Sequence, residues 1–354
     1  MIIFVLAVAL LCLYKIDFVY SRKSKILNPT EIYSDYLSID KTNSIKGIFV
    51  ILIVLSHSQG YLTLQDNILN SLYSVFAGIL GQGVVIMFLF YSGYTMMLSC
   101  TKKGPDYVKS IPVKRVLMVL FNFDVAILIF LIVQTLLGSK FSVGRILLAF
   151  TSLGSLGNSN WYIFAIMMLY LITYLSFIIG KNNKTLVLAI AFILTFAYIV
   201  VMHRFKESYW YDTALLYPIG MLWYTIKDKA EKLLSKSVFI YLAVLGFMLA
   251  LLVVAHHFSY RTVISMVYYI IMGIIILMVT MKIQIQNKIL EFFGKNLFAI
   301  YILQRIPMMI FDRLGLNENP YIFVILSFVA TIVIAIPFNK LVSKLDGVIF
   351  KKIK

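Results

Sequence analysis

The side chains best suited to chemistry lie in residues 40–61, where His57 interrupts an otherwise apolar run that Lys46 opens. The run from Ile48 to Leu55 carries no charge, so we expect a transmembrane helix that begins near Ile45. Side chains that favour helix N-caps precede it: Asp40, Thr42, Asn43 and Ser44.

The spacing of Lys46 and His57 places them on one face of this helix at different depths. In an α-helix their separation returns to the same face within roughly 20° and raises His57 roughly 16 Å above Lys46, about half a hydrocarbon core. An imidazole beside Ser56 and Ser58 can serve as a general base near neutral pH. A structural histidine and a lysine that snorkels to the interface are the alternatives that the residue types leave open.

The composition indicates the kind of fold that positions Lys46 and His57. The chain has 354 residues, 61% hydrophobic and 13% charged, and its mean hydropathy is +0.93. We therefore predict an all-α, polytopic integral membrane protein with about ten core transmembrane helices and one extra N-terminal hydrophobic segment. Residues 1–20 are predicted to form an uncleaved span or an interfacial helix. The core spans are expected at 45–62, 79–99, 113–137, 161–180, 185–203, 212–227, 238–255, 262–281, 289–310 and 320–339.

The basic residues predict the orientation. Of the 32 Lys and Arg residues, 24 fall in the loops assigned to the cytoplasm, 7 on the opposite side, and Lys15 within the first span. This bias predicts a multi-pass protein with a cytoplasmic C-terminus. The richness in Ile, Lys and Asn fits an AT-rich bacterial genome, so the bacterial cytoplasmic membrane is the expected location. The net charge of +17 is thus explained by topology, and we expect no nucleic-acid partner. The two cysteines give neither a disulfide framework nor a metal-ligand spacing, so no metal is expected.

Polar side chains at membrane depth are further candidates. Asp124, with Asn122, is predicted either to pair with a lysine or histidine or to make a helix-packing hydrogen bond. Ser92 and Tyr94 flank Gly93, which favours close helix packing or supplies donors to a site. Gln304 is predicted to face the interior, while Arg305 beside it is interpreted as snorkelling to the interface.

Two other groups are predicted to lie at membrane interfaces. Asn160 and Trp161 suggest an aromatic belt at the outer boundary. His203, His256 and His257 are interpreted as interface residues because they lack the spacing and carboxylates of a metal site. Within the connection 138–160, SVGRILLAFTSL predicts an amphipathic interfacial helix.

In order and spacing, these motifs resemble the membrane-bound acyltransferase family 3. That family carries a cation, ten intervening residues and a histidine in its first core helix, as IKGIFVILIVLSH does here. FLFYSGYTMM (88–97), VKR (113–115), NWYIFAIMMLY (160–170) and FFGKNLFAIYILQRIP (292–307) continue the resemblance over residues 40–340. Three positions depart from the family pattern: Lys46 replaces the usual arginine, Asn43 replaces the acid usually found three residues before it, and Gln304 replaces a frequent histidine.

The resemblance implies transfer of an acyl group, most simply acetyl, from cytoplasmic acetyl-CoA or another acyl-CoA to a hydroxyl of a cell-surface or lipid-linked polysaccharide such as capsule. No tightly bound cofactor is expected. His57 would be the general base or a covalent acyl carrier, and Lys46, Lys114 and Arg115 would meet the phosphates of the donor. Possible substrate or oxyanion contacts are Ser92, Tyr94, Asp124, Asn160, Trp161 and Gln304.

The predicted division of the chain is an N-terminal segment and connector (1–39), the acyltransferase domain (40–340) and a basic tail (341–354). A flippase or transporter for a lipid-linked sugar is the alternative, as is a non-catalytic partner in polysaccharide assembly. Transporters often contain repeats and broken spans, and the sequence shows no repeat. Acyl-CoA-dependent transfer by the purified protein separates the enzyme from both alternatives.

Overall fold

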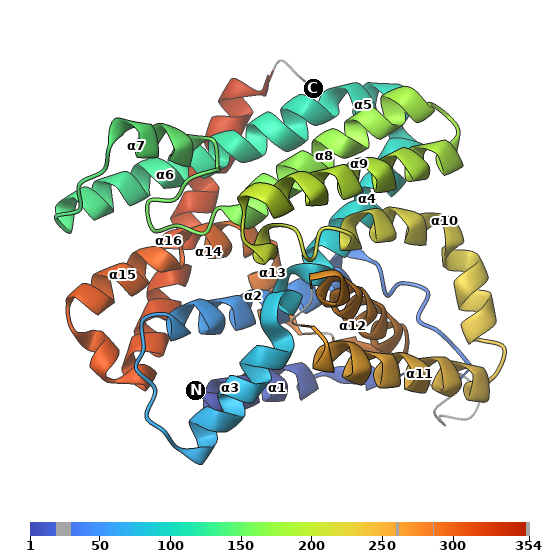
Figure 1. Ribbon diagram of the computed structural model, residues 1–354, viewed down its shortest axis with the longest axis horizontal. Helices are drawn as coiled ribbons and strands as arrows, with labels where there is room; N and C mark the ends of the chain where they lie inside the picture. Colours follow the sequence, from blue (N-terminus) through green and yellow to red (C-terminus); the bar gives the residue numbers. More distant parts are fainter. Residues whose placement is uncertain (19–29, 260–261, 286, 352–354) are drawn as a thin grey trace.

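A computed structural model describes residues 1–18, 30–259, 262–285 and 287–351 (Figure 1). The described chain is a bundle of helices with one pair of three-residue strands. The prediction of an all-α polytopic membrane protein is confirmed, because seven described helical segments are long and apolar enough to cross a membrane.

Six predicted spans correspond to single helices: α8 (Trp161–Gly180), α9 (Lys184–Phe205), α10 (Leu216–Leu234), α11 (Val238–His257), α12 (Thr262–Lys282) and α16 (Pro320–Ile349). Of these, α10 and α16 end seven and ten residues later than predicted. The second predicted core span, 79–99, is formed by the 3₁₀ turn η1 (Gly81–Val85) and α4 (Ile86–Lys103), whereas α3 (Ile68–Leu80) lies almost entirely before it. The third, 113–137, is formed by the π-helical turn η2 (Pro112–Leu117) and α6 (Met118–Leu136), and α5 (Pro105–Ile111) precedes it.

The helix that carries Lys46 and His57 is α2 (Ile39–Gln59), and it starts earlier than predicted. Its N-cap is Ser38, so the expected capping residues lie within the helix. The Thr42 hydroxyl donates to the Ser38 carbonyl and the Ser44 hydroxyl to the Asp40 carbonyl. These intrahelical bonds remove the cost of burying the two hydroxyls. The helix is continuous from Lys46 to His57, so the rise of roughly 16 Å applies.

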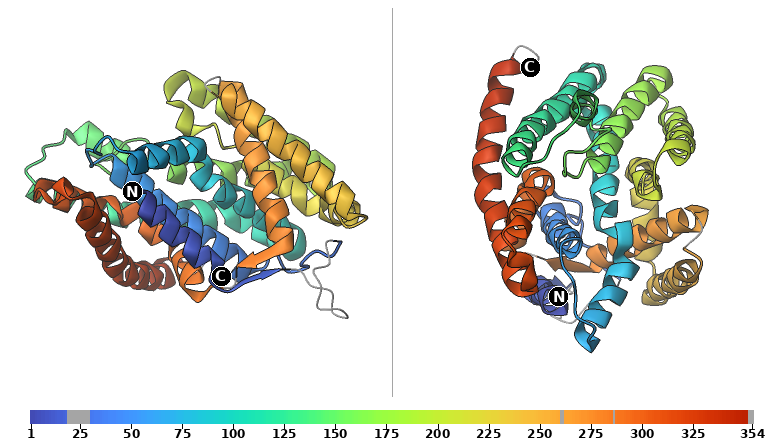
Figure 2. Two further views of the ribbon diagram at one scale, coloured as in Figure 1. Left: turned by 90° about the horizontal axis from the view of Figure 1, so that it is seen from below. Right: turned by 60° about the vertical axis from the view of Figure 1, so that its left-hand side comes forward.

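The predicted span 289–310 is broken into three helices, which corrects the expectation of one continuous helix. They are α13 (Lys288–Lys295), α14 (Leu297–Leu303) and α15 (Arg305–Arg313), with breaks at Asn296 and Gln304. Figure 2 shows α15 beside the long helix α16, which flanks one side of the bundle. Irregular backbone at membrane depth is tolerated where it is buried in protein or lines a cavity.

Glycines bring two pairs of helices into direct backbone contact. A Cβ at Gly93 on α4 would lie 1.9 Å from the Tyr217 carbonyl oxygen on α10, and one at Gly220 would lie 2.1 Å from the Phe90 carbonyl oxygen. Gly47 on α2 and Gly294 on α13 form a second reciprocal contact of this kind. A Cβ at either position would lie 1.9 Å from a backbone carbonyl oxygen of the other helix. Gly93 is therefore a packing residue, one of the two roles that the sequence allowed.

The N-terminal segment is shorter than a membrane span. Helix α1 (Ile2–Leu13) packs on α2 and α3, and its twelve residues extend about 18 Å, against a hydrocarbon core of about 30 Å. Strand β1 (Ile16–Phe18) then pairs antiparallel with β2 (Ile283–Ile285). The predicted interfacial helix appears as α7 (Val143–Phe150), which exposes Val143, Leu147 and Leu148.

Candidate active site

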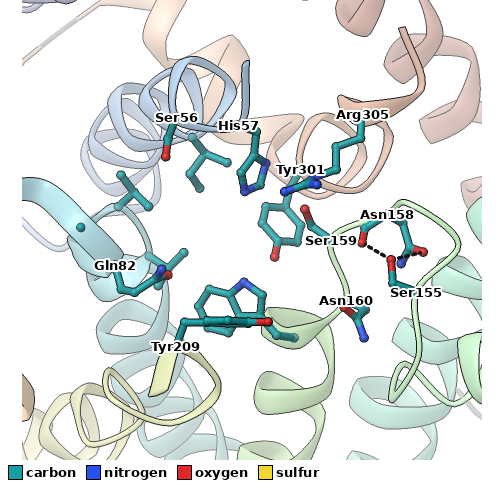
Figure 3. A pocket seen from close by; sticks show the side chains of 15 residues that line it. Ser56, His57, Gln82, Ser155, Asn158, Ser159, Asn160, Tyr209, Tyr301 and Arg305 are labelled. Atoms are coloured by element: carbon teal, nitrogen blue, oxygen red, sulfur yellow. Dashed lines mark hydrogen bonds between the residues drawn. The ribbon is translucent and has the colours of Figure 1, made fainter. Parts of the chain in front are cut away.

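A cavity of about 460 Å³ lies at the C-terminal end of α2, where His57 forms part of its wall (Figure 3). Its other walls come from η1, from the loop before α8, from Tyr209 and from the α14–α15 junction. Helices α4 and α8 both begin at this cavity, and lysines lie at their other ends. The cavity and these lysines are therefore at opposite ends of the bundle. Its lining residues are Ile53, Ser56, His57, Gly81, Gln82, Val84, Val85, Ser155, Asn158, Ser159, Asn160, Trp161, Tyr209, Tyr301 and Arg305.

Two interruptions of helical backbone create this space. At the first, Gly81 has φ +43°, which an L side chain rarely adopts, and the chain turns into η1. The Tyr269 hydroxyl accepts a hydrogen bond from the Gln82 backbone N–H, 3.0 Å away, which satisfies a donor freed by the break. At the second, the chain turns at Gln304, so that Tyr301 and Arg305 from successive helices reach the same cavity.

His57 is half-buried in the last turn of α2. Its ring lies 6.4 Å from the Tyr301 ring, and Figure 3 shows the Arg305 side chain extending toward both. Gln304 is completely buried next to His57, and its amide donates to the Tyr301 carbonyl at 3.0 Å. The predicted inward orientation of Gln304 is therefore observed, whereas Arg305 lines the cavity and is not a snorkelling residue.

Buried polar atoms without a hydrogen-bond partner gather around this cavity. Among the described residues, Nδ1 of His57, Nε of Arg305, Oγ of Ser159 and Nδ2 of Asn158 have none. Folded proteins pair nearly all buried polar atoms, because an unpaired group costs about 1–3 kcal/mol. These polar side chains therefore give the wall of the cavity hydrogen-bonding capacity that a polar molecule can use.

The loop before α8 is rigidly held by its own hydrogen bonds. The Asn160 amide donates to the Ser152 carbonyl at 2.8 Å, and the Leu156 N–H donates to Asn158 Oδ1 at 2.9 Å. Trp161 packs against Tyr209, with ring centroids 6.0 Å apart. Asn160 and Trp161 both line the cavity, so they do more than form an interfacial belt.

Ser92 and Tyr94 lie away from the His57 cavity. Ser92 belongs to a group that we call the Arg115 cluster: Ser92, Tyr107, Arg115 and Tyr170. Within it, Nε and Nη2 of Arg115 donate to the Tyr107 hydroxyl at 3.2 and 3.1 Å. Tyr94 instead packs edge-on against Tyr224 at 6.0 Å. The structure thus divides the predicted contact residues between two places.

The other predicted phosphate-binding residues lie on the Arg115 side. Lys114 and Arg115 both belong to the π-helical turn η2, an irregularity that is frequent at functional sites. The ammonium of Lys46 lies 5.9 Å from the centre of the Tyr91 ring, and Tyr91 directly precedes Ser92 on α4. Lys46 is half-buried, so its environment is not that of a freely snorkelling lysine.

Asp124 does not line the His57 cavity. Its Oδ1 is buried without a hydrogen-bond partner among the described residues. Its neighbour Asn122 donates to Asp346 on α16 at 3.1 Å, the helix-packing bond that the sequence offered as an alternative. Within the described chain no group of three or more His, Cys, Asp and Glu side chains could hold a metal ion.

Several residues of the cavity were not selected from the sequence: Gln82, Ser155, Asn158, Ser159, Tyr209, Tyr301 and Arg305. A signal existed for the loop members, because residues 157–160 read Gly-Asn-Ser-Asn immediately before an apolar span. Arg305 gave a misleading signal, since an arginine near a span end is usually interfacial.

The described helices define the class as a helical membrane protein with a polar cavity beside His57, and comparison with known families makes this specific. A family model described as an acyltransferase domain matches residues 39–340. The chain therefore belongs to this acyltransferase family, and the resemblance inferred from its motifs is confirmed. Searches of curated proteins and of solved structures gave no match.

Proposed function

We propose that this acyltransferase moves an acyl group, most simply acetyl, from cytoplasmic acyl-CoA to a sugar hydroxyl on the opposite side of the membrane, with His57 as the general base. The acceptor is a polysaccharide of the bacterial cell surface or its lipid-linked precursor. The observation that carries the proposal is the cavity of about 460 Å³, whose wall brings together side-chain nitrogen and oxygen atoms of His57, Arg305 and Ser159. A sugar hydroxyl and a polarised carbonyl are the groups that such atoms would bind.

In this mechanism His57 takes the proton of the acceptor hydroxyl as its oxygen attacks the thioester carbonyl. A C–O bond forms, the C–S bond breaks, and CoA leaves as a thiolate that then takes up a proton. Arg305 lies on the same cavity and can donate to the oxyanion of the tetrahedral intermediate. A covalent acyl-histidine formed on His57 before transfer is the variant of this route.

The donor side of the proposal rests on Lys46, Lys114 and Arg115. Lys46 and Arg115 both lie near the segment of α4 that holds Tyr91 and Ser92, and Lys114 directly precedes Arg115 in the chain. Such cations suit the phosphates of CoA. An extended thioester arm would then cover the roughly 16 Å between Lys46 and His57. Aromatic rings lie in series along this distance: Phe49 contacts Phe88, Phe88 contacts Tyr162, and Tyr162 contacts Tyr301. These rings must shift to admit the arm.

The test uses purified protein, acyl-CoA labelled in its acyl group and extracted surface glycan. We expect His57→Ala to lower transfer by about 10²–10⁴-fold, the usual contribution of a general base. His256→Ala is the matched control, because His256 is exposed and packs against Tyr268 outside the cavity.

Label trapped on wild-type protein but absent from His57→Ala would assign the covalent route. Transfer that persists unchanged in His57→Ala contradicts the catalytic role of this residue. Transport of a glycan that needs no acyl-CoA would instead favour the transporter alternative.

A further inference from the structure

The His57 cavity lies next to a series of two further cavities whose linings differ in chemistry. A second cavity of about 540 Å³ shares Ser155, Asn160 and Tyr209 with it. A groove of about 440 Å³ shares His203 and Arg204 with the second cavity. The three spaces are therefore adjacent in series, the His57 cavity next to the second cavity and the second cavity next to the groove that α9 and α12 line.

The groove is apolar and opens on the surface that faces lipid. Its walls are side chains of α9 and α12 together with Tyr211 and Leu215 from the segment before α10, and both α9 and α12 are apolar enough to cross a membrane. Four of these side chains are large and exposed: Phe196 (62%), Val200 (47%), Val263 (71%) and Val267 (44%). An exposed apolar groove at membrane depth suits a hydrocarbon chain.

Basic groups lie where the groove meets the second cavity. Arg204 is exposed and makes no ion pair with any residue that the structure describes. Lys206 lies 4.4 Å from the centre of the Trp210 ring and donates to the Leu153 carbonyl at 3.1 Å. The ring of His203 is hydrogen-bonded to the Tyr211 hydroxyl at 2.7 Å, and Glu207 is the single acid in the lining of the second cavity. The balance favours an anion such as a phosphate.

We infer that the acceptor binds while it is still attached to a lipid phosphate carrier. The hydrocarbon chain lies in the groove between α9 and α12, the phosphate near Arg204 and Lys206, and the sugar in the His57 cavity. Only the placement of the sugar in the His57 cavity rests on the proposed function. The placement of the hydrocarbon chain and the phosphate is argued from the groove and from the basic residues Arg204 and Lys206, which we call its basic mouth.

The three spaces match a single-chain carrier better than the other ligands available at a membrane surface. A free glycan has no apolar part to fill the groove, whereas a phospholipid has no glycan to occupy the His57 cavity. A polyprenyl phosphate that carries a sugar has its chain, its charge and its hydroxyls in the order in which the groove, the basic mouth and the polar cavity occur.

The binding test uses the full chain in phosphatidylcholine nanodiscs with a polyprenyl monophosphate that carries a photoreactive diazirine in its chain. We expect labelling of α9 and α12 peptides around Val200 and Val263, displaced by unlabelled polyprenyl phosphate but not by polyprenol or phosphatidylglycerol. Val263→Trp, which fills the groove, and Arg204→Glu should each reduce labelling roughly tenfold, equivalent to about 1.4 kcal/mol.

Each variant has a matched control. Val253→Trp changes a valine that is also 71% exposed but lies on α11, and Arg313→Glu reverses an exposed charge outside the three spaces. Both controls should label as the wild type does. Equal displacement by phosphatidylglycerol, or equal loss in variants and controls, would overturn the inference.

An activity arm separates this inference from the proposed function. Val263→Trp should lower acyl transfer to a carrier-linked glycan and leave transfer to the same glycan, released from its carrier, unchanged. Specific labelling without any acyl transfer would leave the groove assigned and refute the acyltransfer route. The opposite outcome is an absence of specific labelling together with acyl transfer to both acceptors that Val263→Trp does not change. This result would support the enzyme and refute the carrier site.

Discussion

The two ends of α2 lie in different surroundings. At the His57 end, broken helices and a loop enclose an open polar cavity whose buried atoms lack partners. At the Lys46 end, helices meet backbone to backbone through Gly47 and Gly93, and Arg115 is already bonded to Tyr107. The His57 end thus contains an open polar cavity, whereas the Lys46 end is a close-packed region with cations at its margin.

This difference fits two substrates that approach from opposite sides. A sugar needs many hydrogen bonds within a shaped cavity, whereas the phosphates of CoA need a few cations near solvent. The proposed division of labour predicts that variants at the two ends will affect different kinetic constants.

The largest effect after that of His57 is expected at Arg305. We expect Arg305→Ala to lower kcat by about 10²–10³-fold, as the loss of one preorganised oxyanion donor does, and Arg305→Lys to restore part of the rate. The measurement is steady-state transfer with the acyl-CoA and acceptor concentrations varied in turn. A change confined to KM for the acceptor would make Arg305 a binding residue and would refute its role in the transition state.

A smaller effect, on the donor side, is expected at Lys46. Lys46→Arg keeps the charge and should keep activity, whereas Lys46→Glu should raise KM for acyl-CoA at least tenfold, a loss of about 1.4 kcal/mol in binding. KM for the acceptor should remain that of the wild type in both variants. An active Lys46→Glu enzyme with an unchanged KM for acyl-CoA would remove Lys46 from the donor site.

The smallest effect on chemistry, and a clear effect on stability, is expected at the glycine contacts. Gly93→Ala places a methyl group against the Tyr217 carbonyl, and such overpacking costs about 1–3 kcal/mol of folding free energy. Gly246→Ala on α11 meets no atom within 4 Å and is the matched control. Unfolding in detergent, followed by circular dichroism, should show a lowered midpoint for Gly93→Ala alone. Equal midpoints would mean that α4 and α10 are not in backbone contact.

The sequence predicted the helices well because the membrane imposes their length and apolar character. The predicted span 161–180 coincides with α8, and the predicted spans 185–203 and 262–281 differ from α9 and α12 by at most two residues at either end. The start of α2 was placed too late because Thr42 and Ser44, which favour caps, can also bond to carbonyls within a helix.

The candidate site was harder to predict because it depends on interruptions of the helices. Nothing in the apolar run 297–303 indicates that the chain turns at Gln304 and directs Arg305 inward. Ser92 and His57 both belong to motifs that resemble the family, yet they lie in different regions of the structure. Helix periodicity predicts the helix face on which a side chain lies, but not which neighbouring helix packs against that face. His57 itself could be predicted, since a titratable group within an apolar helix is costly and is kept for a reason.

The central claim is that acyl-CoA and the acceptor act from opposite sides of the membrane. Proteoliposomes with a known protein orientation, acyl-CoA enclosed on the Lys46 side and glycan supplied on the His57 side, test it directly. The account predicts acylated glycan outside while all CoA stays inside, and no product when His57→Ala replaces the wild type. Product that forms only when acyl-CoA and glycan are placed on the same side would contradict it.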